Sequence, residues 1–336
     1  MGARRPRLAL THTPQMRANY YGDRALAGLQ TLGDVVMHEG ADMIGDGALV
    51  DLASKCDILI TDRATPLDAA RIARLDAVAA ILRVAVDIRN IDVAAASAAG
   101  ILVCHASRTW VPAVSELIMG LVIDAARGIS RANIAYKNGR VPDVRRGLQL
   151  SGATAGIIGY GPLGRRVAQL CRAFDMRVVV SDPYVEINDP GIEQASFDTV
   201  CREADVLLPL AVATAETENL IDRRALALMK PTALLINASR GNLIDETALL
   251  DALERGVIAG AAFDVGRAAD QMPSPHLARR ADVSATPHIG GLTTDAIEGQ
   301  ALETVEQVRA LLAGRVPSGA VNAEQATRTA RFAIRI

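Results

Sequence analysis

A glycine-rich segment in the middle of the chain most strongly constrains its fold. An apolar run, residues 155–158, precedes a helix-like segment, residues 165–174, and the glycines between them are Gly159, Gly161 and Gly164 in G-x-G-x-x-G spacing. In a dinucleotide-binding turn the first glycine allows a tight turn, the second lets a pyrophosphate approach the backbone, and the third allows close helix packing. The N-terminus of the helix offers amides and a positive dipole to the phosphates. The segment therefore predicts a strand, a phosphate-binding turn and a helix laid end to end.

The next predicted strand indicates which dinucleotide binds there. It covers residues 177–181 and ends at Asp182. A carboxylate about 20 residues after the glycine turn accepts both ribose hydroxyls of NAD and repels the 2′-phosphate of NADP. A lone G-x-G-x-x-G motif often occurs by chance, but the motif, strand, helix and terminal acid together predict NAD binding.

Short apolar runs alternate with amphipathic segments along both halves of the chain, which predicts parallel strands joined by crossover helices. The first half has five such runs, at residues 8–10, 35–37, 58–61, 78–86 and 101–104. The second half has six, at residues 155–158, 177–181, 205–208, 233–236, 260–263 and 283–285. Only the second series contains a glycine-rich turn, so we expect two separate Rossmann-like α/β domains with doubly wound parallel sheets.

Two long helix-like segments mark the expected domain crossings. Residues 112–128 begin with Pro112, which suits a first helical turn, and end with Gly128, which suits a helix stop. Residues 293–312 carry apolar side chains at helical spacing, and the chain is expected to return there to the first domain. The prediction is a substrate domain of residues 1–106 and 292–336 and an NAD-binding domain of residues 107–291.

Composition and charge exclude several other classes of protein. The formal net charge is -2, and no lysine or arginine run is dense enough to form a nucleic-acid-binding stripe. The longest nearly uncharged apolar stretch, residues 206–215, falls well short of the ~20 residues that a membrane span needs. The four cysteines occur singly, which argues against disulfides and a zinc site. We therefore expect a soluble, cytoplasmic protein that binds no metal, nucleic acid or membrane.

Three loops of the second series carry candidate catalytic side chains, namely Arg240, Asp264 and His288. Each follows a predicted strand, and the carboxyl ends of parallel strands meet at one edge of a sheet, beside the expected nicotinamide. Taken singly, each residue has an ordinary interpretation as a surface charge, a helix cap or a loop histidine. Their joint placement favours a catalytic role.

In their order and their residues, these segments resemble the motifs of the D-isomer-specific 2-hydroxyacid dehydrogenase family. The resemblance covers nearly the whole chain and rests on Gly159-Tyr-Gly-Pro-Leu-Gly164 with Asp182, Asn237-Ala-Ser-Arg-Gly241, Ala262-Phe-Asp-Val265, Thr286-Pro-His-Ile-Gly-Gly291, Asn90-Ile-Asp92 and Val114-Ser-Glu116. It implies a flavodoxin-like substrate domain beside the NAD-binding domain, a homodimer, and NAD-dependent oxidoreduction of a small 2-hydroxy or 2-oxo acid.

The resemblance also implies roles for single residues. Arg240 would bind and polarise the substrate's carbonyl or carboxylate, a contact that the guanidinium fork suits. His288 would be the general acid in reduction and the general base in oxidation, since imidazole titrates near neutral pH. Asp264 would hold the nicotinamide carboxamide region. The remaining cofactor contacts would come from the glycine turn and two later loops, at Pro162, Leu163, Ala238 and Gly290.

The chain departs from the family pattern beside the catalytic histidine. Family members carry a glutamate, paired with the histidine, five residues after the aspartate that corresponds to Asp264, and here that position is Ala269. The usual aromatic residue of this loop is Gly266, and the nearest acid is Asp270. Either Asp270 is a shorter substitute for the glutamate, or His288 works without a carboxylate.

A second departure concerns the substrate end. Family members cradle the substrate carboxylate at a glycine-containing turn, which here includes Val86, Asp87 and Arg89. Asp87 replaces the glycine and would repel an anionic substrate unless an arginine offsets its charge. A second alternative is that Asp87 points away from the substrate or pairs with a nearby arginine. If neither holds, the substrate is less anionic at this end or binds in a different pose. Trp110, the only tryptophan, either walls the substrate pocket or packs beneath the following helix.

These departures leave two further classes of function open. The chain could use bound NAD for non-redox chemistry of the lyase or hydratase type. It could also be an NAD-sensing binding protein with little turnover, although the presence of Arg240 and His288 argues against a pure sensor.

Overall fold

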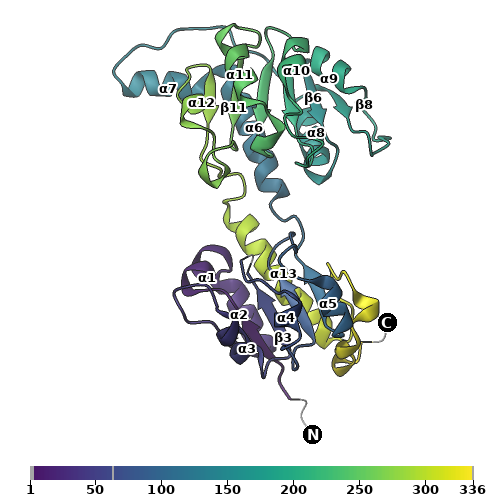
Figure 1. Cartoon of the computed structure of the whole chain (residues 1–336). Helices are drawn as coiled ribbons and strands as arrows, with labels where there is room; N and C mark the ends of the chain where they lie inside the picture. The colour runs from purple at the N-terminus through teal and green to yellow at the C-terminus, as the bar shows by residue number, and fades with distance from the viewer. Residues whose placement is uncertain (1–3, 63, 335–336) are drawn as a thin grey trace. The chain divides into compact units, whose positions relative to one another are not determined.

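The computed structural model describes residues 4–62 and 64–334, and Figure 1 shows the course of the chain. The chain forms two compact units. The first contains the chain up to Trp110 together with the chain from Thr293 onward, and the second contains Val111–Leu292. Each unit is built on its own parallel sheet.

The first unit contains a five-stranded sheet with the order β2-β1-β3-β4-β5 and only parallel pairings, which is the flavodoxin-like order. Its strands are β1 (Arg7–Leu10), β2 (Asp34–Met37), β3 (Ile58–Thr61), β4 (Ala80–Arg83) and β5 (Leu102–His105). The central strands β3 and β4 are buried along their whole length, which explains why they read as continuous apolar runs. The strand expected over residues 78–86 ends early, because the chain leaves the sheet after Arg83 and turns.

Helices of the first unit come from both of its chain segments. They are α1 (Pro14–Tyr20), α2 (Asp23–Leu32), α3 (Asp46–Ala53), α4 (Ala69–Ile72), α5 (Val93–Ala98) and α13 (Thr294–Leu312). The helix-like stretch at residues 17–32 is divided between α1 and α2 at Gly22, whose φ of 83° is unfavourable for other residues. The last helix, α13, packs on α2, and its Val305 and Val308 share a buried cluster with Leu8 and Leu29.

The second unit contains a seven-stranded parallel sheet with the order β12-β11-β10-β9-β6-β7-β8. Its strands are β6 (Thr154–Ile158), β7 (Arg177–Ser181), β8 (Ile192–Gln194), β9 (Val206–Pro209), β10 (Leu234–Asn237), β11 (Gly260–Phe263) and β12 (Val283–Ala285). Six strands are confirmed, whereas β8 was not expected because its three residues are too few and too polar to form an apolar run. The chain order reverses between β6 and β9, the place where doubly wound sheets bind their ligands.

Seven helices accompany this sheet in the described part of the unit: α6 (Val111–Arg127), α7 (Ile129–Lys137), α8 (Pro162–Ala173), α9 (Phe197–Glu203), α10 (Arg223–Leu228), α11 (Glu246–Glu254) and α12 (Pro275–Ala278). The long helix α6 packs on α8 and on β10, β11 and β12. In contrast, α7 has no buried residue, and Figure 1 shows it extending away from the sheet. None of the described helices is long and apolar enough to cross a membrane.

Candidate dinucleotide and catalytic site

The glycine turn between β6 and α8 has the geometry that its sequence predicts. Gly159 has a φ of 98°, and a Cβ there would lie 2.7 Å from the amide nitrogen of Ala211. A Cβ at Gly164 would overlap the carbonyl oxygen of Gly159, so helix and turn pack without space for a side chain. At Gly161 an added Cβ would meet no atom within 4 Å, so space is open where the helix begins. The turn therefore fits a phosphate group beside the N-terminus of α8.

Asp182 follows β7 and is tied to the same turn. Its Oδ2 accepts a 2.7 Å hydrogen bond from the amide of Tyr160, and its Oδ1 accepts one of 2.9 Å from the amide of Tyr184. Each carboxylate oxygen can accept a second hydrogen bond, which leaves acceptor capacity for ribose hydroxyls. The residues present thus fit a dinucleotide with an unmodified ribose.

The loop after β10 presents Arg240. Asn237 is fully buried at the strand end, where its Nδ2 donates to the carbonyl oxygen of Arg240 at 2.9 Å and its Oδ1 accepts from the amide of Ser239 at 3.0 Å. These two bonds close residues 238–240 into a tight loop, with Ala238 buried and Arg240 exposed. The Arg240 guanidinium makes one hydrogen bond within the described chain, to the Ser239 carbonyl at 2.7 Å. Most of its donors are therefore available to an anion.

Asp264 follows β11, and its carboxylate holds the loop that carries His288. It is 1% exposed, and its Oδ1 accepts from the Thr286 hydroxyl at 2.6 Å and the Ile289 amide at 2.8 Å. Its Oδ2 accepts from the Gly290 amide at 2.8 Å. The buried carboxylate therefore positions this loop, and the expected role of Asp264 in holding the nicotinamide region stays a prediction. The pairing of β11 with β12 brings the two loops together, but the sequence did not indicate that Asp264 holds the loop of His288.

His288 is held from the other side by the loop that follows Asp264. Its Nδ1 lies 2.8 Å from the main-chain oxygen of Asp270, and its own φ is 56°. The contact in this structure is made by the Asp270 main chain, and the two alternatives, a substitute carboxylate at Asp270 and a His288 that works without a carboxylate, stay predictions. A carbonyl only accepts, so Nδ1 carries the hydrogen in this contact and Nε2 of the neutral ring is an acceptor.

Arg267 anchors the loop of Asp270, and no motif in the sequence indicated it. Its guanidinium donates to Glu218 Oε1 at 2.7 Å, to Asn219 Oδ1 at 2.5 Å and to the carbonyl oxygens of Asn242 and Ile244 at 3.0 Å. These partners lie between 23 and 49 positions away in sequence, so only the fold brings them to Arg267.

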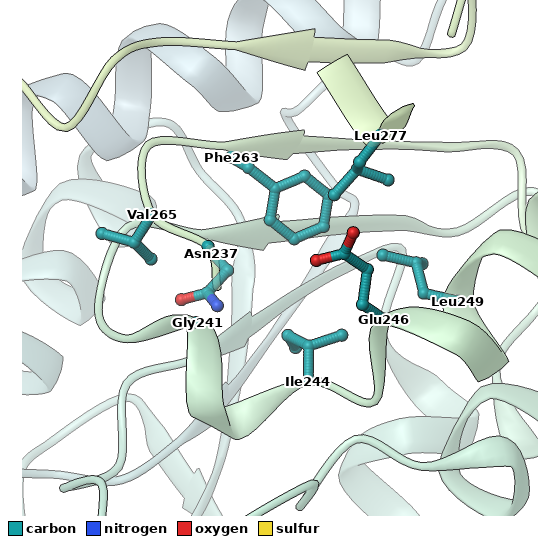
Figure 2. A pocket seen from close by; sticks show the side chains of 9 residues that line it. Asn237, Gly241, Ile244, Glu246, Leu249, Phe263, Val265 and Leu277 are labelled. Carbon is teal, nitrogen blue, oxygen red and sulfur yellow. The ribbon is translucent and has the colours of Figure 1, made fainter. Parts of the chain in front are cut away.

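A small cavity lies behind these loops, and Figure 2 shows the side chains around it. Its lining is mostly apolar and consists of Asn237, Gly241, Ile244, Glu246, Leu249, Phe263, Val265, Gly266 and Leu277. The Glu246 carboxylate is directed toward Phe263 and Leu277, and its Oε1 accepts a hydrogen bond from Ser274. The free space of ≈ 10 Å³ holds about one water molecule, so the cavity backs the loops and is too small for a substrate.

The structure brings together two of the substrate residues expected in the first unit. Asp87 pairs with Arg89: its Oδ1 accepts from the Arg89 amide at 3.0 Å, and its Oδ2 accepts from the Arg89 Nη2 at 2.6 Å. These hydrogen bonds lower the pKa of Asp87 to about 2. The buried Arg83 donates from Nε to the Asp87 carbonyl oxygen at 3.0 Å, while Val86 and Trp110 are half-buried. Of the alternatives for Asp87, pairing with an arginine is the one that the structure shows.

These features define a two-domain α/β protein in which one doubly wound sheet carries a dinucleotide-binding turn. Residues 119–290 match the protein family described as D-isomer specific 2-hydroxyacid dehydrogenase, NAD binding domain. The chain is 33% identical over 299 residues to a D-3-phosphoglycerate dehydrogenase of Methanocaldococcus jannaschii, covering 88% of this chain and 56% of that protein. It is 32% identical over 265 residues to a hydroxypyruvate reductase of Thermotoga maritima, covering 77% and 86% respectively.

A solved structure agrees with these sequence relationships. The structure resembles that of the TT0316 protein from Thermus thermophilus, with a TM-score of 0.77, 30% identity, and coverage of 94% of this chain and 99% of the other. The chain belongs to the D-isomer specific 2-hydroxyacid dehydrogenase family of oxidoreductases, and its second unit contains the family's NAD binding domain. It spans about half the length of the phosphoglycerate dehydrogenases that it matches.

Proposed function

We propose that this protein catalyses the NAD-dependent interconversion of a small 2-hydroxy acid and its 2-oxo acid. The family, the glycine turn and Asp182 support NAD as the cofactor. The names of its relatives, which include phosphoglycerate dehydrogenase and hydroxypyruvate reductase, support a small hydroxy-acid substrate.

The candidate site assigns a separate task to each side chain. NAD, when bound, accepts or donates the hydride. Arg240, with donors left over after its bond to Ser239, binds the carboxylate and carbonyl of the substrate and sets their orientation. His288 exchanges a proton at Nε2 with the substrate oxygen, removing it during oxidation and returning it during reduction.

One observation carries this proposal. His288 is fixed through its loop by the buried Asp264 and through Nδ1 by Asp270, while no described residue forms a hydrogen bond to its Nε2. A ring nitrogen without a protein partner is free to exchange a proton with the substrate oxygen. This arrangement is the one expected of a general acid and base.

The proposal is tested by following NADH absorbance with a panel of 2-oxo acids that differ in size and charge. We expect turnover with at least one of them, and a loss of about 100-fold or more in kcat for His288→Asn with little change in NADH affinity. For Arg240→Lys we expect KM for the 2-oxo acid to rise, because an ammonium cannot replace the two-pronged contact. Tight NADH binding with no consumption of NADH on any acid would refute the proposal and favour an NAD sensor or a non-redox enzyme.

The exposed helix α7 supports a homodimer as the assembly of this enzyme. Large apolar side chains are exposed on α7 and the segment after it, at Ile129, Ile134, Tyr136, Val141 and Val144. Such a concentration of exposed apolar residues marks an association surface, and a second copy of the chain would cover it. Light scattering should show a dimer, and replacing Tyr136 and Val144 by serine should shift it toward monomer; an unaltered dimer would place the interface elsewhere.

A further inference from the structure

We propose that the main-chain carbonyl of Asp270, and not a side-chain carboxylate, positions His288 for proton transfer. This inference rests on the proposed function, because it concerns the histidine that exchanges the proton. It assigns to Asp270 a positioning role that depends on the backbone conformation at residues 270 and 271.

The backbone at this contact adopts a conformation that most residues avoid. Six non-glycine residues in the described chain have a positive φ, and three of them meet here: Asp270 at 55°, Gln271 at 57° and His288 at 56°. A non-glycine residue keeps such a conformation only where the surrounding structure enforces it, and such residues cluster at functional sites. The loop is therefore held in a conformation that serves the contact with His288.

Hydrogen bonds within the loop enforce this conformation. The Met272 amide donates to the Ala269 carbonyl at 3.1 Å, which closes a tight turn with positive φ at its two central residues, as in a type I′ turn. The Gly266 amide donates to the Gln271 carbonyl at 2.7 Å, and the Ala268 amide donates to the Met272 carbonyl at 3.0 Å. Together these bonds direct the Asp270 carbonyl toward the imidazole.

Gly266 makes this loop possible because the backbone comes too close for a side chain. A Cβ at Gly266 would lie 2.5 Å from both the carbonyl oxygen of Met272 and the Cα of Pro273. A Cβ at Gly241, in the loop of Arg240, would overlap the main chain of Gly266. The loop conformation that brings the Asp270 carbonyl to His288 therefore requires a glycine at position 266.

The charged groups on the neighbouring loops do not replace this contact. None of the side chains of Arg240, Asp264, Arg267 and Asp270, which lie on the loops around His288, forms a hydrogen bond or ion pair with the imidazole in the described chain. A carbonyl fixes which ring nitrogen carries the hydrogen without adding a negative charge beside the ring.

The experiment separates the conformation at position 270 from its charge. Asp270→Asn and Asp270→Gly remove the carboxylate but tolerate positive φ, whereas Asp270→Val and Asp270→Pro remove the carboxylate and disfavour positive φ. The first readout is the ¹⁵N NMR signature of the His288 ring in the full chain without substrate, assigned by its loss in His288→Asn. The second is the pH-rate profile of NADH-dependent reduction, together with the Kd for NADH.

We expect Asp270→Asn and Asp270→Gly to retain the Nδ1–H signature and the shape of the pH-rate profile. Asp270→Val and Asp270→Pro should give a mixture of ring tautomers and lower kcat by about tenfold or more, with the Kd for NADH unchanged. A loss of the signature in Asp270→Asn would show that the carboxylate is the partner and overturn the proposal. Retention of the signature in Asp270→Val would overturn it as well.

Two controls keep the outcome clear. If the variants at position 270 fail to fold, Gln271→Gly and Gln271→Val make the same comparison at the second central residue of the turn. The NMR readout needs no turnover, so a wild-type chain with the Nδ1–H signature but no activity on any 2-oxo acid would refute the proposed function alone.

Discussion

The carboxylate of Asp264 accepts a 2.8 Å hydrogen bond from the amide of Gly290, two residues beyond the catalytic histidine candidate. The same carboxylate also accepts hydrogen bonds from Thr286 and Ile289, so one buried side chain fixes the conformation of the loop that carries His288. A Cβ at Gly290 would lie 2.9 Å from the same carboxylate oxygen, so the contact also explains why a glycine stands there.

We predict that Asp264→Asn loosens the His288 loop. An amide offers one oxygen in place of two, so a buried N–H group loses its acceptor, at a cost of about 1–3 kcal/mol of stability. The variant should lower kcat more than it raises KM, because His288 is misplaced while the substrate contacts remain. Thermal unfolding and steady-state kinetics measure the two effects. Thr286→Val, which removes only the hydroxyl donor, is the milder control, and equal effects of the two variants would contradict this view of Asp264.

The proposed ribose-binding role of Asp182 predicts a change in the preference between NADH and NADPH. Asp182→Ala should weaken NADH binding by about tenfold and narrow the preference over NADPH, because the hydroxyl acceptor and the charge that repels a 2′-phosphate are both lost. Titration of each dinucleotide by fluorescence measures this. Asp182→Asn removes the charge and keeps one of the two oxygens that accept from the Tyr160 and Tyr184 amides, so it disturbs the turn less than Asp182→Ala does. An unchanged ratio of the two affinities would mean that Asp182 does not contact the ribose.

The pairing of Asp87 with Arg89 predicts how mutation of Asp87 changes the KM for an anionic substrate. With its pKa lowered to about 2 by Arg89, Asp87 is ionised throughout the range in which an enzyme is assayed, and it occupies both the amide and the guanidinium of Arg89. Asp87→Gly frees these donors, so KM for anionic 2-oxo acids should fall while the Kd for NADH stays the same. Asp87→Asn removes the charge alone, so its KM should lie between those of the wild type and Asp87→Gly. A KM that is equal in all three proteins would place Asp87 away from the substrate.

Buried His12 predicts that stability depends on pH. Burial lowers the pKa of His12 from 6.5 to about 4; the charge of Asp62 opposes this shift, and the charges of Arg83 and Arg17 add to it. Between these values the unfolded chain binds a proton that the folded chain does not, so stability falls as the pH falls from 6.5 toward 4. The loss amounts to about 3 kcal/mol below pH 4.

His12→Asn should remove this part of the pH dependence, since asparagine does not titrate. Urea unfolding at several pH values, followed by the fluorescence of the single tryptophan Trp110 in the first unit, measures the difference between the two proteins. Parallel curves for wild type and variant would show that the pKa of His12 is the same in the folded and the unfolded protein.

The sequence indicated the local parts of the site better than the long-range ones. The glycine turn and Asp182 could be predicted because strand, turn and helix follow one another along the chain. Arg240, Asp264 and His288 could be placed on one sheet edge because each ends a strand, and β10, β11 and β12 are neighbours.

Other parts depend on distant contacts or on backbone conformation. The clamp of Arg267 joins residues far apart in the chain, and the carbonyl of Asp270 reaches His288 only through positive φ values that no residue type required. The pairing of Asp87 with Arg89 was one of several alternatives, because composition does not say which way an exposed carboxylate turns.

The first unit is assembled from both ends of the chain, with α13 packed against α2, and this sets an order on biosynthesis. The ribosome synthesises every residue of the second unit before it makes α13. The second unit can therefore fold on the nascent chain before α13 is available. The segment up to Trp110 cannot complete its core until Val305 and Val308 emerge from the ribosome. Truncation before α13 should leave the NAD-binding unit folded and expose the first segment to proteolysis.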